Sequence, residues 1–339
     1  MKIQKFNTKE KVFIIAEIGN NHEGSYTLAE EMVGLAAETG ADAVKFQTFK
    51  TEYYVSSDDA HRFKRLKSFE LTYNEFEKLS VVAKGLGLSF ISTPFDIESA
   101  LFLNSIVDAL KISSGDNNFY PLLETVAETG KPIIMSSGLT DIQQIVKSKK
   151  LIEKIWDQEN IVQDIAILHC VSAYPVEPIF ANLKAIQTLR KSLNCTIGLS
   201  DHTLGVNAAI ASVGLGARII EKHFTIDKHF SDFRDHHMSS DPNEMKQLIQ
   251  SIREVEIMLG SGDKVLQLPE KDSALQMRRS IIAKYPLSKG HILQFDDITW
   301  VRPFGGLEPG EEQRIIGKRL NQDIQKGEKI LINHISEDD

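Results

Sequence analysis

Two histidines in this sequence are spaced as the ligands of one metal ion would be. His202 follows an apolar run at 197–200, and His223 ends a second run at 217–223, with a small-residue helical segment between them. Apolar run, helix and apolar run are typical of parallel strands buried on both faces. Neighbouring strands lie about 4.8 Å apart, so both imidazoles would reach the same edge of the sheet and could share a cation with open positions for substrate. The alternative is two unrelated histidines, each with a local hydrogen bond.

Cationic and hydroxyl side chains accompany other apolar runs. Two lysines lie inside AVKFQ and ALKIS, and the full set is Lys45, Lys111, Ser114, Ser136 and Ser200. Small residues at strand ends let backbone N–H groups approach an anion, and lysines neutralise its charge. The set therefore predicts a site for a small phosphorylated substrate. The alternatives are surface lysines lying along the protein and the Schiff-base lysine of a metal-free aldolase, which the histidine pair disfavours.

Three carboxylates are candidates for chemistry beside these groups. Glu17 and Asp235 are the best candidates for transferring protons or holding sugar hydroxyls, with a solvated loop residue as the alternative for Asp235. Glu221 lies two residues before His223 and shares its strand face. It could hold a metal-bound water or pair with a lysine.

Other ionisable residues near these positions are expected to have structural roles. Asp201 and Lys222 alternate away from the histidine pair, which favours salt bridges in the core or toward the helices. We expect His236 and His237 to be exposed. His169 is expected to be a strand-end histidine satisfied by a local hydrogen bond.

The wider pattern is that of a (β/α)8 barrel, or TIM barrel, because eight apolar runs alternate with helical segments. The runs lie at 12–18, 41–48, 88–95, 108–116, 131–138, 164–175, 197–200 and 217–223. Polar groups stand at their carboxyl ends, in order Glu17, Lys45, Thr93, Lys111, Ser136, the segment 169–174, His202 and His223. A barrel builds its active site at this end, and a long polar excursion at 49–70 is expected to contribute to it. A doubly wound open sheet is the alternative, but the sequence has no dinucleotide-binding fingerprint.

The pattern changes after residue 260, so 1–260 is expected to be the catalytic domain. The segment 261–277 has no long apolar run and is expected to be a linker to a small β-rich domain at 278–339. Similar stretches at 285–293 and 322–330 begin 37 residues apart and both contain Lys-Gly after a strand-like run. This near-repeat indicates a compact pseudo-symmetric module.

Composition argues against several classes of protein. The 339 residues carry a formal net charge of −8, which disfavours a general nucleic-acid binder. Cys170 and Cys195 are the only cysteines, so a disulfide framework or a cysteine-based zinc site is not expected. No apolar run approaches about 20 residues and no signal sequence precedes the first run, so we expect a cytoplasmic protein without a membrane segment.

An ordered series of motifs runs through nearly the whole sequence: IIAEIGNNHEGS, DAVKFQT, FISTPF, LKISSGDNN, KPIIMSSG, LHCVSAYP, IGLSDHTLG, IIEKHF, RRSIIAKYPLSKG and ITWVRPFGG. With these motifs the chain resembles the sialic acid synthases, which condense phosphoenolpyruvate with an N-acyl hexosamine to a nine-carbon 2-keto acid. The resemblance implies a metal-assisted reaction with C–O cleavage and release of phosphate. It also implies that the C-terminal module is an antifreeze-like domain of the β-clip type.

The resemblance further implies a role for each candidate residue. His202 and His223 would hold a divalent cation, usually Mn2+, with Mg2+ or Co2+ as alternatives. The residues that would bind phosphoenolpyruvate are Lys45, Thr93, Lys111, Ser114, Ser136 and Ser200. Glu17 and Asp235 would act near the sugar, whose further contacts would be Asp116, Ser172, Tyr174 and Arg302. Arg302 would reach the N-acyl group from the partner subunit of a domain-swapped homodimer.

Two positions depart from the neuraminate-forming members of that family. Asp116 stands where they have Glu, and Ser172 stands where they have Asn. Both positions face the sugar, so N-acetylmannosamine, a legionaminic- or pseudaminic-type precursor and a spore-coat polysaccharide sugar all remain candidate acceptors. Two other hypotheses are a metal-dependent aldolase of another family and a glycan-binding protein with a degenerate barrel. Polar groups at all eight strand ends argue against the degenerate barrel.

Overall fold

A computed structural model describes residues 1–336 of the chain. The chain folds into two compact units, Met1–Gly260 and Ser261–Asp339. Across the described residues, every helix is too short or too polar to span a lipid bilayer.

The first unit contains a closed barrel of eight parallel strands, which confirms the predicted TIM barrel. The strands are β3 (Phe13–Gly19), β4 (Ala43–Thr48), β5 (Ser89–Pro94), β6 (Ala109–Ile112), β7 (Ile133–Ser136), β8 (Ile165–Cys170), β9 (Thr196–Asp201) and β10 (Ile219–His223). Each strand pairs with its neighbours along the chain, and β10 closes the ring on β3. Both faces of the strands are buried, which explains why their sequences are nearly continuous apolar runs.

Inside the barrel, a polar layer lies directly above an apolar one. Ile15 is in the inner apolar cluster and precedes Glu17 by two residues. Ala43 belongs to the same cluster and precedes Lys45 by two. Residues two apart in a strand share a face, so Glu17 and Lys45 also point inward, one step closer to the carboxyl end. The strand register places Glu17 beside Lys45 on one side and beside His223 on the other.

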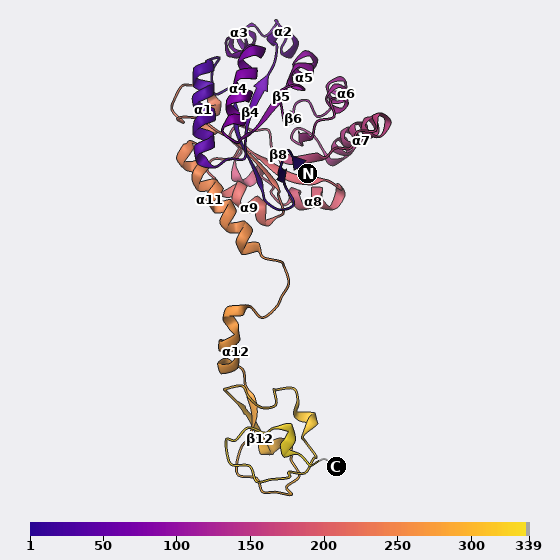
Figure 1. The fold of residues 1–339 in the computed structure, drawn as a ribbon, viewed down its shortest axis with the longest axis vertical. Coiled ribbons are helices and arrows are strands. Elements are labelled where there is room, and N and C mark those ends of the chain that lie inside the picture. The colour runs from indigo at the N-terminus through magenta and orange to yellow at the C-terminus, as the bar shows by residue number, and fades with distance from the viewer. Residues whose placement is uncertain (337–339) are drawn as a thin grey trace. The chain divides into compact units, whose positions relative to one another are not determined.

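Helices surround the barrel and pack on the outward-facing strand residues (Figure 1). They are α1 (Tyr26–Thr39), α4 (Tyr73–Gly85), α5 (Ile97–Leu103), α6 (Tyr120–Glu128), α7 (Ile142–Glu159), α8 (Ala185–Ser192), α9 (Asn207–Gly214) and α11 (Pro242–Leu259). Several begin at a side-chain cap; at α4, Thr72 and Glu75 form a capping box. These caps satisfy the first backbone N–H groups and fix where each loop ends and its helix begins.

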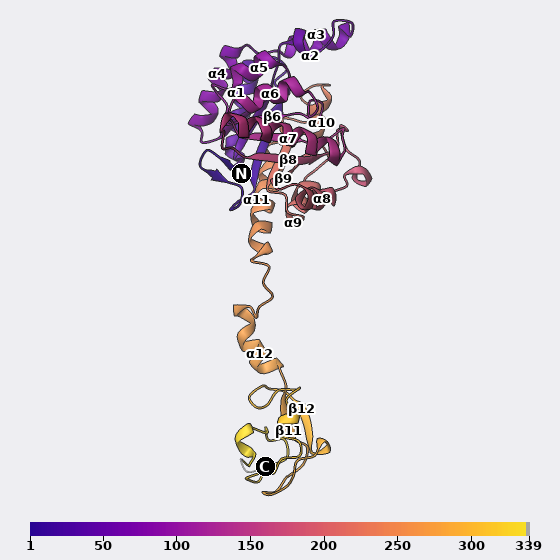
Figure 2. The ribbon, with the colours of Figure 1, turned by 90° about the vertical axis from the view of Figure 1, so that its right-hand side faces the viewer.

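Shorter elements lie at the two ends of the barrel. The excursion at 49–70 contains α2 (Thr51–Tyr54) and α3 (Ala60–Phe69), which lie together at one end of the unit in Figures 1 and 2. A hairpin of β1 (Lys2–Ile3) and β2 (Phe6–Asn7), absent from the sequence-based expectations, joins the inner apolar cluster through Met1 and Ile3.

The second unit begins with helical turns where the sequence led us to expect a linker. These are a 3-10 turn, η2 (Leu268–Glu270), and helix α12 (Lys271–Met277). Beyond them, β11 (Ser280–Ala283) pairs antiparallel with β12 (Ile298–Val301), as Figure 2 shows. The unit has a separate apolar core. Three further 3-10 turns are η3 (Phe295–Asp297), η4 (Glu312–Arg314) and η5 (Ile332–His334).

The near-repeat in the sequence of this unit has a structural counterpart. Leu287, in the first copy, and Ile324, in the second, form an antiparallel bridge, with backbone hydrogen bonds of 2.9 and 2.8 Å. The two copies therefore pair with each other, which accounts for a compact module with little regular strand.

Candidate active site

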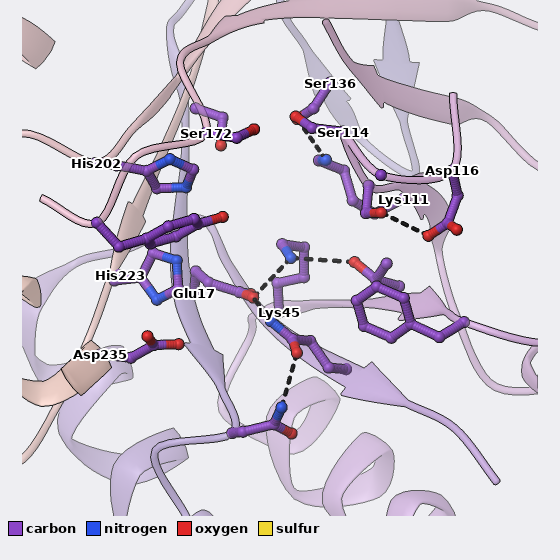
Figure 3. A pocket seen from close by; sticks show the side chains of 18 of the residues that line it. Glu17, Lys45, Lys111, Ser114, Asp116, Ser136, Ser172, His202, His223 and Asp235 are labelled. Carbon is purple, nitrogen blue, oxygen red and sulfur yellow. Dashed lines mark hydrogen bonds and ion pairs between the residues drawn. The ribbon is translucent and has the colours of Figure 1, made fainter. Parts of the chain in front are cut away.

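A cavity of about 540 Å³ opens at the carboxyl end of the barrel strands. Its lining includes every candidate site residue of the first unit: Glu17, Lys45, Thr93, Lys111, Ser114, Asp116, Ser136, Ser172, Tyr174, Ser200, His202, His223 and Asp235. Figure 3 shows the labelled side chains converging on this cavity from different strands and loops. The barrel topology alone accounts for this convergence, because all eight strands end at the same rim.

Lys45 is the centre of a buried ionic network. Its Nζ lies 2.8 Å from Glu17 Oε1 and 3.8 Å from Glu221 Oε2, and it donates a hydrogen bond of 3.1 Å to Thr93 Oγ1. Burial raises the pKa of Glu17 above its usual value, although Lys45 opposes the shift. Glu17 is therefore a carboxyl group that can hold a proton closer to neutral pH than a solvated one.

Lys111 approaches the same network from β6. Its Nζ donates to Ser136 Oγ at 2.6 Å and lies 4.0 Å from Glu221 Oε2. Burial lowers the pKa of Lys111, while Glu221 counteracts the shift. Glu221 also accepts a hydrogen bond from Ser200 at 2.9 Å. Glu221 thus lies within ion-pair distance of both lysines, as one of its two sequence-based interpretations expects, while its Oε2 makes no hydrogen bond within residues 1–336.

The two Ser-Ser-Gly segments meet at the cavity wall. Gly138 N donates to Ser114 Oγ at 3.1 Å, and a Cβ at Gly138 would lie 2.4 Å from Ser172 Oγ. This close approach explains why glycine occupies the position. Ser172 Oγ is buried without a hydrogen-bond partner in the described protein. Asp116 accepts a hydrogen bond from Ser113, and burial raises the pKa of Asp116.

The two histidines lie side by side, with ring centroids 5.4 Å apart. His202 Nδ1 donates to Val171 O at 2.9 Å, which leaves Nε2 of His202 available to a ligand. His223 Nδ1 is buried without a hydrogen-bond partner among residues 1–336. Burial and the neighbouring His202 hold the pKa of His223 well below its usual value. Within the described chain, no three His, Cys, Asp or Glu side chains are grouped to hold a metal unaided.

Tyr174, Arg234 and Asp235 form a stack beside the histidines. The Tyr174 ring lies 4.3 Å from the His202 ring, and the Arg234 guanidinium lies 4.8 Å from the Tyr174 centroid. Arg234 Nε donates to Asp235 Oδ1 at 3.2 Å. Burial nevertheless raises the pKa of Asp235, with Arg234 opposing. Asp235 thus resembles Glu17 in being a carboxyl group with an elevated pKa that faces the cavity.

His236 is fully buried, so its expected exposure was wrong, whereas His237 is exposed as expected. The His236 ring contacts Thr225 Oγ1 at 2.6 Å and Glu23 Oε1 at 3.0 Å. Ser231 also donates to Glu23. These contacts, here called the Glu23–His236 clasp, tie the loop after β10 to the loop after β3. The error arose because α10 (Arg234–Met238), which carries the histidine inward, is too short to leave a periodic pattern.

Other sequence-based expectations for polar residues agree with the geometry. Lys222 and Asp201 form a buried pair at 3.0 Å on the outward face of the strands. His169 Nε2 contacts Ala181 O at 2.9 Å, so its ring has a local hydrogen bond. Arg302 is exposed in the second unit.

Several cavity residues were not identified individually from the sequence. Gln47 accepts a hydrogen bond from Asn20 at 2.8 Å and donates to Glu17 at 3.3 Å. Tyr54 and Arg62 line the cavity from the excursion at 49–70. The length of that excursion was a signal for the segment, but nothing in its composition distinguished these two side chains.

The comparisons with known proteins cover nearly the whole chain. The NeuB family matches residues 32–264, and the SAF domain matches residues 278–336. The N,N'-diacetyllegionaminic acid synthase of Legionella pneumophila is 40% identical, over 95% of this chain and 94% of that protein. The human N-acetylneuraminate-9-phosphate synthase is 30% identical, over 94% of this chain and 91% of that protein.

A solved structure supports the same assignment. The N-acetylneuraminic acid synthetase of Leptospira borgpetersenii, in complex with citrate, has a TM-score of 0.75 and 33% identity, covering 80% of this chain and 94% of that one. The predicted resemblance to the sialic acid synthases is confirmed. The chain belongs to the NeuB family of enzymes and carries a C-terminal SAF domain.

Proposed function

We propose that this protein condenses phosphoenolpyruvate with an N-acyl hexosamine, giving a nine-carbon nonulosonic acid and phosphate. One observation carries the proposal: a single barrel cavity combines a buried lysine and serine cradle, two adjacent imidazoles and two carboxyl groups of raised pKa. Membership of the NeuB family and the synthases among its relatives support the same reaction. A degenerate, glycan-binding barrel would have no need for ionic groups buried this deeply, because burying charge is costly.

The cradle suits phosphoenolpyruvate because it offers both charge and hydrogen-bond donors. Lys45 and Lys111 supply positive charge for the carboxylate and the phosphate. Thr93 and Ser136 accept hydrogen bonds from these lysines, so their own hydroxyl protons remain available to the anion. Ser114 and Ser200 complete the proposed binding set on the same lining.

His202 and His223 are the proposed ligands of a divalent cation, with Mn2+ preferred and Mg2+ or Co2+ as alternatives. The residues fit such an ion, because the Val171 carbonyl leaves Nε2 of His202 available and His223 Nδ1 has no hydrogen-bond partner in the described part of the chain. The lowered pKa of His223 keeps that imidazole neutral, which is the form that binds metals. When bound, the cation would polarise the aldehyde oxygen of the open-chain sugar.

The proposed reaction follows from these positions. Carbon 3 of the enol phosphate attacks the aldehyde carbon, and the new C–C bond leaves a cationic centre at carbon 2. Water adds at carbon 2, and the tetrahedral intermediate collapses with cleavage of the C–O bond to phosphate. Glu17 and Asp235 would hand a proton to the sugar oxygen or take one from the attacking water, a role that the raised pKa of both carboxyl groups supports. Lys45 and Lys111 stabilise the negative charge on the departing phosphate.

We also propose a homodimer in which Arg302 of each subunit serves the acceptor site of the other. Arg302 is exposed, and its guanidinium offers a fixed fork of donors that suits the oxygen of an N-acyl group. We further propose that the protein is cytoplasmic, because phosphoenolpyruvate is a metabolite of that compartment.

A phosphate-release assay tests the proposed reaction. The protein is incubated with phosphoenolpyruvate, Mn2+ and a panel of N-acyl hexosamines, and the product is identified by mass spectrometry. We expect one phosphate per nine-carbon keto acid formed. Formation of the keto acid from pyruvate, with no phosphate released from phosphoenolpyruvate, would instead identify an aldolase.

A further inference from the structure

One wall of the cavity has no role in the proposed chemistry. We call it the acceptor wall, and its residues are Tyr54, Arg62, Arg65, Leu66, Phe69 and Phe95. All except Phe95 come from the excursion at 49–70. The proposed ligands of phosphoenolpyruvate and of the cation come from other residues, so this wall is left to face the second substrate.

The acceptor wall is anchored at both ends of the excursion. Glu70 accepts hydrogen bonds from Thr51 N at 3.0 Å and Thr51 Oγ1 at 2.9 Å, and it lies 3.4 Å from Lys50 Nζ. Lys50 N donates to Asp96 Oδ2 at 2.8 Å, in the connection between β5 and α5. These contacts hold the wall in place before a ligand binds, which lowers the entropic cost of binding.

The surface of the wall is aromatic, with guanidinium groups beside it. Tyr54 stacks on Phe95 with ring centroids 4.3 Å apart, and the Arg62 guanidinium lies 5.7 Å from the Tyr54 centroid. Phe69 meets Phe233 edge to face at 5.1 Å. Aromatic rings provide apolar contact for methyl groups, and a guanidinium donates hydrogen bonds to a carbonyl oxygen. An acylamino group presents both a methyl and a carbonyl.

The apolar side chains of the acceptor wall favour an uncharged substituent of the sugar. Leu66 and Phe69 are both almost completely buried and line the cavity beside Arg62 and Arg65. A phosphate on the sugar would lose hydration against these two side chains, which is costly.

We propose that the acceptor wall binds the end of the sugar remote from its aldehyde and selects an uncharged hexosamine with a second acylamino group. This inference rests on the proposed condensation. The name of the Legionella relative's product, N,N'-diacetyllegionaminic acid, specifies two acetylated nitrogens. Phosphoenolpyruvate contains no nitrogen, so an acceptor for such a product must bring both.

The first test compares three acceptors in the phosphate-release assay. They are 2,4-diacetamido-2,4,6-trideoxymannose, N-acetylmannosamine and N-acetylmannosamine 6-phosphate. We expect kcat/KM to be at least about tenfold higher for the diacetamido sugar, the gain of one charge-assisted hydrogen bond. A preference for either other sugar would overturn the inference and leave the condensation intact. No phosphate release with any sugar would overturn the condensation itself.

The second test substitutes one arginine of the wall and a neighbour that does not face the cavity. Arg62→Ala is expected to raise the KM of the diacetamido sugar about tenfold while the KM of phosphoenolpyruvate stays unchanged. Lys64→Ala is the matched control, because Lys64 is exposed on the same helix and does not line the cavity. Equal KM values for the two variants would show that the wall does not bind the second acylamino group. An equal rise in the KM of N-acetylmannosamine would show the same.

Discussion

Lys45 and Lys111 reach the cavity from within β4 and β6, whereas Asp116 lies in the loop after β6 and Asp235 on the short helix α10 in the segment after β10. The strand-borne residues Glu17, Lys45, Lys111 and Glu221 form the floor of the site, and all four are almost completely buried. The loop-borne residues and the acceptor wall form the rim, where the side chain of Arg234 is 69% exposed. Closure of the barrel fixes the positions of the floor residues, which suits the reaction that a family has in common. The rim is built from connecting segments, whose variation suits the choice of acceptor.

The two regions also differ in how they tolerate substitution. On the floor, each charged group has several ionic partners, and removal of one partner leaves a buried charge less well compensated. On the rim, Arg62 and Arg234 are exposed to solvent, so a change there acts mainly on the bound sugar. The predictions that follow test this division, beginning with the largest expected effect.

Removal of the divalent cation should abolish activity altogether. Chelation is expected to stop phosphate release, and Mn2+ is expected to restore it, because the imidazole pair leaves coordination positions open for the substrate. The His202→Ala and His223→Ala variants should bind no Mn2+ in a direct titration and should not be restored. Circular dichroism checks that both variants are folded. Full activity in metal-free buffer would contradict this role of the two histidines.

The main effect of Lys111→Ala should be weaker binding of phosphoenolpyruvate. Charge-assisted hydrogen bonds contribute about 1.5–3 kcal/mol, so the affinity should fall about ten- to more than a hundredfold in a calorimetric titration. Glu221 keeps Lys45 and Ser200 as partners, so the variant should remain folded. Mn2+ binding serves as the control and should be retained. An unchanged affinity would place Lys111 outside the substrate site.

The sequence predicts the floor of the site better than its rim. Lys45 and Lys111 were recognised because a charge inside a buried apolar run is rare unless it has a function or a partner. The strand period of two then places them on the inner face. His236 and Arg62 lie on short helices within irregular segments, where periodicity gives no orientation. Their positions depend on long-range contacts, such as the one between Glu23 and His236, which a single sequence does not encode locally.

The Arg302→Ala variant tests whether a residue of the second unit helps to bind the acceptor sugar. If Arg302 serves the partner's acceptor site, the variant should raise the KM of the N-acyl sugar about tenfold and leave that of phosphoenolpyruvate nearly unchanged. Steady-state kinetics with each substrate varied in turn gives both values. Arg314 is exposed in the same unit, so Arg314→Ala is a suitable control for Arg302→Ala.

Mixing variants separates a shared site from a site within one chain. Arg302→Ala and His202→Ala each lack one part of the proposed site. After subunit exchange, mixed dimers should contain an intact site and regain activity above the mean of the two variants. A fully active monomer, or no gain despite demonstrated exchange, would rule out the shared site.

The Glu23–His236 clasp should have the smallest effect, and one confined to the acceptor. Asp235 directly precedes His236, and the clasp holds their short helix against the loop after β3. His236→Leu removes hydrogen bonds that contribute about 1 kcal/mol each, so the sugar KM should rise several-fold through misplacement of Asp235. His236→Gln should recover part of this loss, since its amide can still donate to Glu23. The exposed neighbour His237 provides the control variant His237→Leu. Equal kinetics for the Leu variants would show that the rim holds Asp235 without the clasp, whereas a parallel loss of phosphoenolpyruvate affinity would show that floor and rim are not separable.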